Sequence, residues 1–220
     1  MKNELKSTLE KVADNLRKNN MEAFIAEDKA QAKEIVQSLL KDGMSVAAGG
    51  SESLKECGVY DLLTSGRYSF IDRSKGKTPE EVHKLYEEQY GCDTYFCSSN
   101  AVTEDGVLYN VDGNSNRVSM IAFGPRSVVM VVGYNKIVKD LDEAILRVKT
   151  IAAPKNTVRL NIDTYCSKCG ECVSISQGKG TVMSCGCDSD ARICCNYLIS
   201  SKQRHKGRIK VVLVGKKLGY

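Results

Sequence analysis

The sequence predicts one α/β domain built on a mainly parallel, open sheet that is covered by helices. The N-terminal part alternates helical patterns with short apolar runs, in the order helix, strand, helix, strand, glycines, helix. Four apolar, β-branched runs read as buried parallel strands, at 44–48, 93–98, 128–132 and 209–214. With 220 residues and 42% hydrophobic content, the chain can form a full core.

The spacing of apolar residues, and the residues that begin and end helices, predict the first elements. In order, we expect a helix at 3–19, a strand at 21–25, a helix at 28–41 and a strand at 44–48. Gly43 ends the second helix. Ser51 or Ser53 can cap a helix that begins within 51–56.

The later elements are predicted in the same way. We expect a short strand at 68–71, a helix at 78–90, strands at 93–98, 107–111, 118–123 and 128–132, a helix at 135–153 and a last strand at 209–214. The helix at 78–90 has a clear start, with Thr78 as cap, Pro79 at its first position and Glu81 three residues after the cap. Pro154 is expected to stop the helix before it.

Three polar loops at strand ends form a candidate ligand site: 49–51, 98–106 and 112–117. In open parallel sheets, ligands bind beyond the carboxyl ends of the strands. Arg117 can pair with a carboxylate or phosphate, and glycines before a helix let a backbone approach an anion. The candidate ligand-binding residues are Gly49, Gly50, Ser51, Asn100, Asp112, Asn114, Asn116 and Arg117.

Glu104 and Asp105 are candidates for a base or a nucleophile. The competing interpretation makes the 98–106 and 112–117 loops plain hairpin turns, because each contains Asp-Gly. The sequence does not decide whether the chain is an enzyme.

Seven of the ten cysteines lie between Cys166 and Cys195. Three occur within seven residues, as Cys166-x2-Cys169-x2-Cys172. Such density indicates disulfides in an oxidising compartment or a metal in a reducing one, and zinc and four-iron clusters both take four thiolates. A cysteine-rich loop without a ligand is the third interpretation.

The N-terminus has no apolar stretch of signal-peptide length, and no run approaches ~18 apolar residues. We therefore expect a cytoplasmic protein with reduced thiols and no membrane insertion, which favours a metal. The net charge is +5, and Lys202, Arg204 and Lys206 gather near the C-terminus. No aromatic residue is interleaved with them, so we expect a solvated turn and no nucleic-acid partner.

Three stretches resemble the LUD domain, the family of bacterial lactate-utilisation proteins: GGSESL, the block from SSNAVTEDG to KTIAAPKN, and the closing RIKVVLVGKKLGY. The resemblance covers nearly the whole chain, so we expect a single LUD domain over 1–220. It implies a fold similar to the NagB/RpiA/CoA-transferase group. It also makes 163–197 a cysteine-rich metal-binding segment inserted before the last strand.

Many members of that family carry a pattern C…G-x-C…C-x-S-x-x-R-I-C-N, which here places cysteines at Cys166, Cys172, Cys187 and Cys194. The resemblance therefore implies that these four hold one metal centre, with Cys169, Cys185 and Cys195 as reserves. A 4Fe–4S iron–sulfur cluster is favoured over zinc, because some members are encoded beside iron–sulfur proteins that oxidise lactate to pyruvate.

Three functions follow. The first is a lactate-utilisation protein with a thiolate metal centre that works beside iron–sulfur oxidoreductase subunits. The second is an enzyme acting on a small anionic metabolite, phosphorylated or CoA-linked, at the three loops. The third is a metabolite-binding regulatory module without chemistry. The substrate and the oligomeric state stay open.

Overall fold

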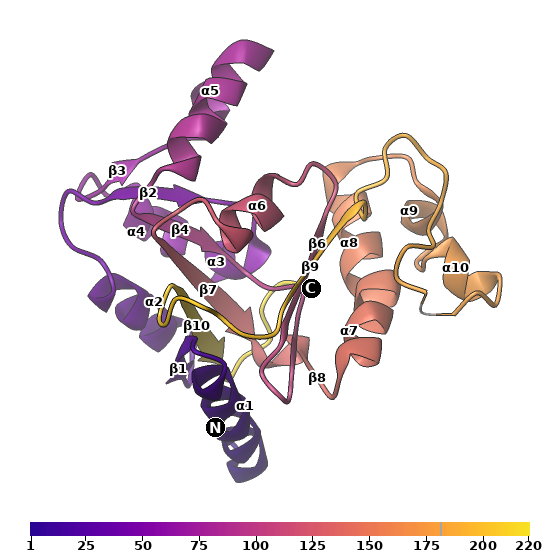
Figure 1. The fold of residues 1–220 in the computed structure, drawn as a ribbon, viewed down its shortest axis with the longest axis horizontal. Helices are drawn as coiled ribbons and strands as arrows, with labels where there is room; N and C mark the ends of the chain where they lie inside the picture. The colour runs from indigo at the N-terminus through magenta and orange to yellow at the C-terminus, as the bar shows by residue number, and fades with distance from the viewer. Residues whose placement is uncertain (181) are drawn as a thin grey trace.

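The computed structural model describes residues 1–180 and 182–220. Its centre is a six-stranded, all-parallel sheet in the order β1-β10-β7-β4-β2-β3 (Figure 1). The strands are β1 (Glu22–Ala26), β2 (Ser45–Ala48), β3 (Ser69–Phe70), β4 (Thr94–Cys97), β7 (Ser127–Gly133) and β10 (Ile209–Val214). The predicted α/β class is confirmed, and β10 lies inside the main sheet, between β1 and β7.

A second, four-stranded sheet has the order β8-β5-β6-β9. Its strands are β5 (Ala101–Thr103), β6 (Leu108–Asp112), β8 (Ile137–Val138) and β9 (Asn196–Ser200). β6 pairs antiparallel with both β5 and β9. Because β9 directly follows the cysteine segment, this pairing ties the end of that segment to the loop after β6.

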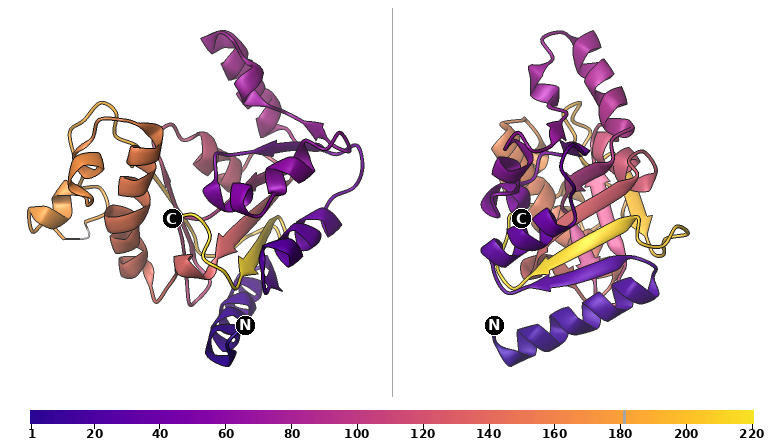
Figure 2. Two further views of the ribbon diagram at one scale, coloured as in Figure 1. Left: turned by 180° about the vertical axis from the view of Figure 1, so that it is seen from behind. Right: turned by 90° about the vertical axis from the view of Figure 1, so that its left-hand side faces the viewer.

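The helices are α1 (Asn3–Lys18), α2 (Lys29–Ser38), α3 (Glu52–Glu56), α4 (Val59–Leu63), α5 (Pro79–Tyr90), α6 (Asn116–Ala122), α7 (Leu141–Arg147), α8 (Ala153–Leu160), α9 (Tyr165–Cys169) and α10 (Val173–Ser176). Short helical turns occupy Arg73–Lys75, Tyr134–Lys136 and Val148–Ala152. Figure 2 shows α5 projecting from the body of the molecule, and α9 and α10 on the side opposite β3. Within the described residues, none of the helices is long and apolar enough to cross a membrane.

Helices cover both faces of the main sheet. On one face, α1, α6 and the second sheet pack against alternate side chains of β7 such as Val128 and Met130. On the other face, α2, α3 and α4 pack against the intervening side chains, such as Val129 and Val131. Successive side chains of β7 thus point alternately into two separate cores, as expected for a central parallel strand.

The predicted caps form as hydrogen bonds. Ser51 Oγ accepts the N–H of Leu54 at 3.3 Å and caps α3. Thr78 Oγ1 accepts the N–H of Glu81 at 3.2 Å and caps α5.

The strand predicted at 118–123 is wrong, since Asn116–Ala122 forms helix α6. The Asp112 carboxylate explains the difference. Its Oδ2 accepts the N–H groups of Arg117 at 3.1 Å and Val118 at 2.9 Å, at the N-terminus of the helix. An acid outside the apolar run therefore overrides the β preference of that run.

The predicted helix at 135–153 starts later and does not end at Pro154. Helical structure runs from Leu141 to Leu160, with a π-helical turn at Val148–Ala152 before the proline. In that turn the N–H of Ala153 bonds to Val148 O. The extra residue relieves the clash that proline causes in a regular helix.

Candidate functional site

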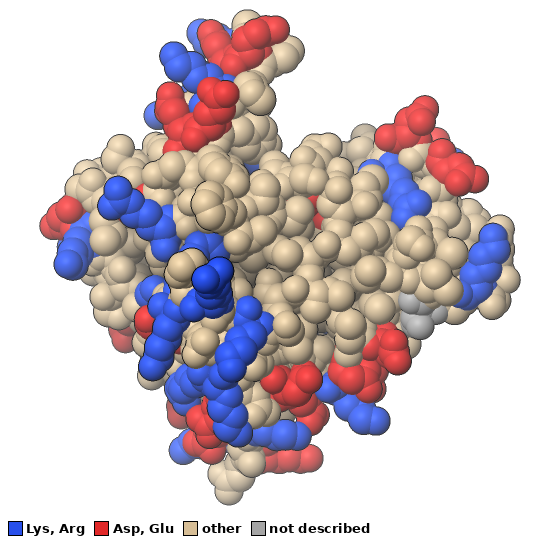
Figure 3. All heavy atoms as spheres, viewed as in Figure 1, with Lys and Arg blue, Asp and Glu red and all other residues tan. Residues whose placement is uncertain are grey.

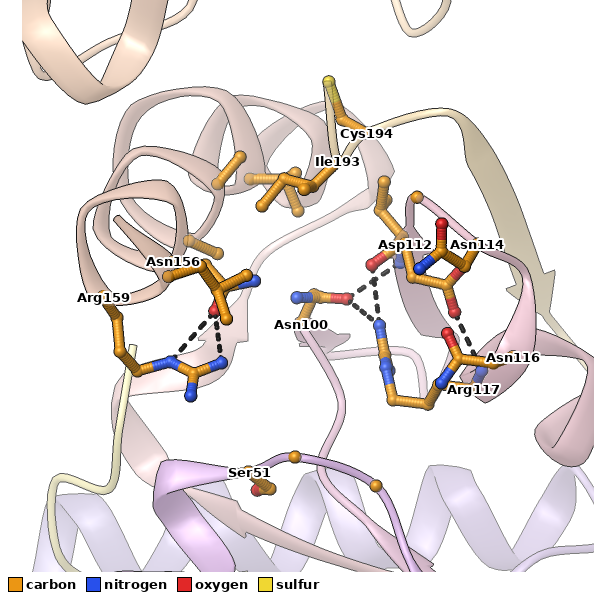
Figure 4. Close-up of a pocket in the computed structure, with 18 of the residues that line it drawn as sticks. Ser51, Asn100, Asp112, Asn114, Asn116, Arg117, Asn156, Arg159, Ile193 and Cys194 are labelled. Carbon is orange, nitrogen blue, oxygen red and sulfur yellow. Dashed lines mark hydrogen bonds between the residues drawn. The ribbon is translucent and has the colours of Figure 1, made fainter. Parts of the chain in front are cut away.

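The three predicted loops line one cleft of about 560 Å³. It opens at the carboxyl ends of the adjacent strands β2, β4 and β7, where residues 49–51, 98–100 and 136 follow those strands. All eight candidate ligand-binding residues line it: Gly49, Gly50, Ser51, Asn100, Asp112, Asn114, Asn116 and Arg117. Figure 4 shows most of them around a space that α8 closes on the opposite side.

Arg117 orients side chains of the cleft, and its terminal N–H groups are not free to bind a ligand. Its Nη1 donates to Ser98 O at 3.2 Å and Asn110 Oδ1 at 2.6 Å, and its Nη2 donates to Asn100 Oδ1 and Val111 O, each at 2.7 Å. The N–H of Val111 also donates to Asn100 Oδ1 at 2.8 Å. Because two donors hold the oxygen of Asn100, its amide nitrogen points into the cleft (Figure 4).

Asn156 on α8 has the same arrangement, and the sequence analysis missed it. Arg159 Nη2 donates to Asn156 Oδ1 at 2.8 Å, and the hydroxyl of Tyr220 donates to it at 2.9 Å. The amide nitrogen of Asn156 therefore faces Asn100 across the cleft (Figure 4). Asn156 was overlooked because the helix was expected to end before it.

Two glycines allow close approaches that shape the cleft. A Cβ on Gly49 would lie 2.5 Å from the hydroxyl oxygen of Tyr95. A Cβ on Gly113 would lie 3.1 Å from Cα of Ile193, in the cysteine segment. Glycine at 113 thus lets that segment pack directly against the 112–117 loop.

Arg73 is a cation of the cleft with donors to spare. Its guanidinium carbon lies 5.5 Å from the ring centroid of Tyr86, and its Nη1 donates to the Tyr86 hydroxyl at 2.9 Å. Within the described part of the chain, this is its one side-chain hydrogen bond and it forms no ion pair. The remaining N–H groups of Arg73 can therefore bind a ligand anion.

Lys136 also lines the cleft and was missed by the sequence analysis. It is 4% exposed, and its Nζ lies 3.0 Å from Ser53 Oγ and 3.1 Å from Ser98 Oγ. Burial lowers the pKa of its amine to about 7, and the charges of Arg147 and Arg117 act in the same direction. Its place after the carboxyl end of an apolar run was the available signal.

Glu104 and Asp105 do not line the cleft. Glu104 lies in the β5–β6 turn and pairs with Lys11 of α1, with 2.6 Å between Lys11 Nζ and Glu104 Oε2. Asp105 accepts a hydrogen bond from Thr103 in the same turn. The Glu104 carboxylate thus links this turn to α1, and the Asp105 carboxylate bonds within the turn.

The cysteines of the family pattern line a second, much smaller cavity. Cys166, Cys172, Cys187 and Cys194 all face a space of about 20 Å³, whereas Cys169, Cys185 and Cys195 do not. The cavity is otherwise mainly apolar, with Tyr109, Val148 and Met183 among its lining residues. All ten cysteines are free thiols.

Two cationic side chains lie beside the thiols of this cavity. Lys149 is 6% exposed, and its Nζ donates to Ser174 Oγ at 2.9 Å and to Cys185 O at 2.5 Å and lies 3.8 Å from Cys172 Sγ. Arg192 Nε lies 3.2 Å from Cys194 Sγ. Burial raises the pKa of the Cys194 thiol, Arg192 opposes this, and Cys172 and Cys187 add to it. Two of the other three thiols thus lie close enough to Cys194 to affect its pKa.

The donor set fits a thiolate metal centre in its chemistry, because four thiols and two cations match a ligand shell of net negative charge. Among the described residues, however, no three His, Cys, Asp or Glu side chains are grouped closely enough to hold an ion. A volume of about 20 Å³ suits a single ion, and a four-iron cluster needs the walls to move further.

The basic residues between β9 and β10 line neither cavity. Lys202, Arg204 and Lys206 are exposed in the connection between β9 and β10. In Figure 3, Lys and Arg side chains gather on the surface in this region and around α1. The cations beside the thiols, Lys149 and Arg192, come from other elements.

Comparisons with known proteins agree with the fold. A family model described as the LUD domain matches residues 9–214. The chain is also similar to the crystal structure of a DUF162 family protein from Deinococcus radiodurans, with a TM-score of 0.52 and 13% identity, over 96% of this chain and 98% of that chain. At this identity the likeness shows the fold alone. None of the curated proteins compared with the chain matches it.

Proposed function

The chain belongs to the LUD domain family, and we propose that it binds a small anionic metabolite in the cleft and a metal in the adjoining thiol cavity. The lactate-utilisation role associated with the family makes lactate and pyruvate the first anions to test. In this proposal the protein works in the cytoplasm and supports iron–sulfur-linked oxidation of lactate to pyruvate, beside partner oxidoreductase subunits.

One observation carries the anion site. The amide nitrogens of Asn100 and Asn156 face each other across the cleft, each fixed because an arginine holds the amide oxygen. Opposed N–H donors with Arg73 nearby favour an oxyanion over a cation or an apolar ligand. A small carboxylate or phosphate is the ligand class that this donor set recognises.

The metal site is proposed on the four thiols that share the small cavity. Cys166, Cys172, Cys187 and Cys194 would be the ligands, with Lys149 and Arg192 balancing their charge. An iron–sulfur cluster would supply electron transfer there, and zinc would supply structural order. Either metal would draw the thiols together, since a thiolate ligand set is stable only around a cation.

Ligand screening tests the anion site. We expect lactate, pyruvate or inorganic phosphate to raise the melting temperature of the protein, and Arg73→Met to remove that shift. Arg67→Met is the matched control, because Arg67 pairs with Asp42 outside the cleft. If none of the three anions shifts wild type, the anion proposal is wrong. Turnover of the bound anion would identify an enzyme, and stabilisation without turnover a regulatory module.

Metal analysis under anaerobic conditions tests the thiol centre. We expect iron with labile sulfide, or zinc, in the wild type, and loss of metal when any one of the four ligand cysteines is changed to Ser. The same change at Cys169, Cys185 or Cys195 is the control, since these thiols do not line the cavity. Wild type that holds neither iron nor zinc would refute the centre.

A further inference from the structure

Lys136 sits at the carboxyl ends of the central strands, where the cleft meets the core. It follows β7, and its amine reaches Ser53 of α3 and Ser98 after β4 at 3.0 and 3.1 Å. Ser53 Oγ donates in turn to Leu218 O at 3.3 Å, so Ser53 accepts from the amine. The hydroxyl of Ser98, which lines the cleft, accepts from the amine and donates to Ser99 O at 3.4 Å, so its oxygen can receive a proton from the amine.

The charges around Lys136 are mainly positive. Arg117 of α6 and Arg147 of α7 disfavour a charged amine, whereas Glu56 of α3 and Cys97 of β4 act weakly in the other direction. None of the ion pairs found among the described residues includes Lys136. A buried amine without a carboxylate partner holds a free electron pair near neutral pH, which is the state that attacks electrophiles.

From this placement we propose that Lys136 forms an imine with the carbonyl carbon of an anionic carbonyl compound bound in the cleft. The proposal rests on the anion site described above, and it narrows the ligand to a molecule with both an anionic group and a carbonyl. The donors of Asn100, Asn156 and Arg73 would bind the anionic group, while the amine meets the carbonyl.

The step balances without a further reactant. The amine nitrogen attacks the carbonyl carbon, and the carbonyl oxygen takes up a proton that the nitrogen gives up, with Ser98 placed to pass it. The resulting hydroxyl leaves as water with the second amine proton, so that a C=N bond replaces the C=O bond. No electron is gained or lost, and hydrolysis reverses the step.

Two classes of compound combine an anionic group with a carbonyl: 2-oxo acids and the open-chain forms of sugar phosphates. The test uses the whole wild-type protein with sodium cyanoborohydride, which reduces an imine to a stable amine. The probes are glyoxylate and pyruvate for the first source, glyceraldehyde 3-phosphate for the second, and propanal as a neutral control. Peptide mass spectrometry locates the modified lysines, and Lys149, similarly buried but outside the cleft, is the internal control.

We expect an anionic probe to modify Lys136 at pH 7 at least about tenfold faster than Lys149, because the cleft holds the carbonyl beside Lys136, whereas Lys149 does not line the cleft. Inorganic phosphate should slow this modification by competition. If the 2-oxo acids modify Lys136 faster, the ligand is a 2-oxo acid; if glyceraldehyde 3-phosphate does, the ligand is a sugar phosphate. Equal modification of Lys136 by propanal and by the anionic probes would refute both the anion site and this ligand class. If the anionic probes stabilise the protein yet leave Lys136 unmodified, the imine is wrong and the anion site stands.

Discussion

At the level of single residues, the orientation of an amide decides whether the cleft offers donors or acceptors. Arg117 and Tyr220 stand on opposite sides of the cleft, and each bonds an asparagine oxygen. Neither needs to touch a ligand to determine which ligand binds. Arg117 was expected to contact the anion itself, and in the structure its terminal N–H groups are taken by protein oxygens.

Changing Asn100 to Asp tests this orientation with almost no change in shape. Arg117 can still bond the side chain, but a carboxylate oxygen replaces the N–H group that faces the cleft. We expect anion affinity to fall about tenfold to a hundredfold, because a charge-assisted hydrogen bond becomes a repulsion. Isothermal titration with the anion that stabilises wild type best measures the loss.

The control is Asn3→Asp, which makes the same charge change at the start of α1, far along the chain from the cleft residues. Asn3→Asp should bind as wild type does. Equal affinities for wild type and Asn100→Asp would show that Asn100 does not contact the anion.

The pKa of Lys136 predicts a pH-dependent stability. It is about 7 in the folded protein and 10.5 in an ordinary lysine, so between these values the unfolded chain binds the extra proton. The free energy of unfolding should therefore rise with pH above 7, by about 1.4 kcal/mol per unit. Above pH 9 the buried thiols Cys57, Cys92 and Cys97, whose pKa values are raised, act in the opposite direction.

Urea unfolding of wild type and Lys136→Met between pH 7 and 9 measures this effect. The difference between the two free energies should change by about 1.4 kcal/mol per pH unit, because the substitution removes the titrating group. Lys155→Met, on exposed α8 surface, is the control. Parallel curves for Lys136→Met and wild type would mean that Lys136 stays charged when folded.

The sequence predicted the cleft residues that lie in polar loops, but it did not predict the cleft residues Lys136 and Asn156. Gly49 and Asn114 were identified because turn chemistry and strand ends are visible in the sequence. Lys136 and Asn156 were not, since Lys136 was marked by nothing more than its place after an apolar run, and Asn156 lay beyond the expected end of its helix. Their roles depend on which elements pack together, as the contact of Lys136 with Ser53 shows.

At the level of elements, the π-helical turn at Val148–Ala152 connects the helix to the thiol cavity. Since Ala153 bonds to Val148 O, the carbonyl of Lys149 is left without its usual helical donor. The N–H of Cys172 takes that place at 2.8 Å. The irregularity before Pro154 thus docks the cysteine segment and brings the Lys149 side chain beside Cys172.

Lys149→Met should weaken the metal centre while the fold persists. Methionine keeps the apolar stem of lysine but removes the cation beside Cys172, so the charge of the thiolates is less well balanced. We expect metal affinity to fall about tenfold to a hundredfold, as for other partners of metal ligands. Competition with a chromogenic chelator measures it, and Lys155→Met is again the control. Unchanged affinity in Lys149→Met would remove Lys149 from the site.

The elements that the sequence predicted wrongly share a cause. The helix α6 and the continuation of α8 both depend on groups outside the local pattern, namely the Asp112 carboxylate and the turn before Pro154. The second sheet was not separated from the first either, because β5 and β6 have the same apolar character as buried parallel strands. The position of most strands could be predicted from the sequence, whereas the partner of each strand and the direction of pairing could not.

At the scale of the whole molecule, the two cavities share a wall. Val148, Ala153 and Cys194 line both of them. In Figure 4 the sulfur of Cys194 points away from the space that Asn100 and Asn156 face. The thiol therefore belongs to the small cavity, while the neighbouring chain closes the cleft.

The cysteine segment is also tied to the ligand loop by its backbone. The N–H of Cys195 donates to Asp112 O at 3.1 Å, and Asn196 Nδ2 donates to Gly113 O at 2.9 Å. Ile193 packs on Gly113, as described above. A metal that orders the segment through Cys194 would thus order one side of the cleft as well.

This connection predicts that metal and anion bind cooperatively. Metal-loaded protein should bind the anion about fivefold more tightly than metal-free protein, or more, a typical size for coupled sites. Because coupling between binding free energies is reciprocal, the anion should raise metal affinity by the same factor.

Titrating each ligand in the presence and absence of the other measures both affinities and their dependence on each other. Cys194→Ser, which should hold no metal, should bind the anion as weakly as metal-free wild type, while Cys169→Ser, outside both cavities, should leave the factor unchanged. If the anion binds equally well with and without metal, the shared wall does not transmit order, and the two sites act independently.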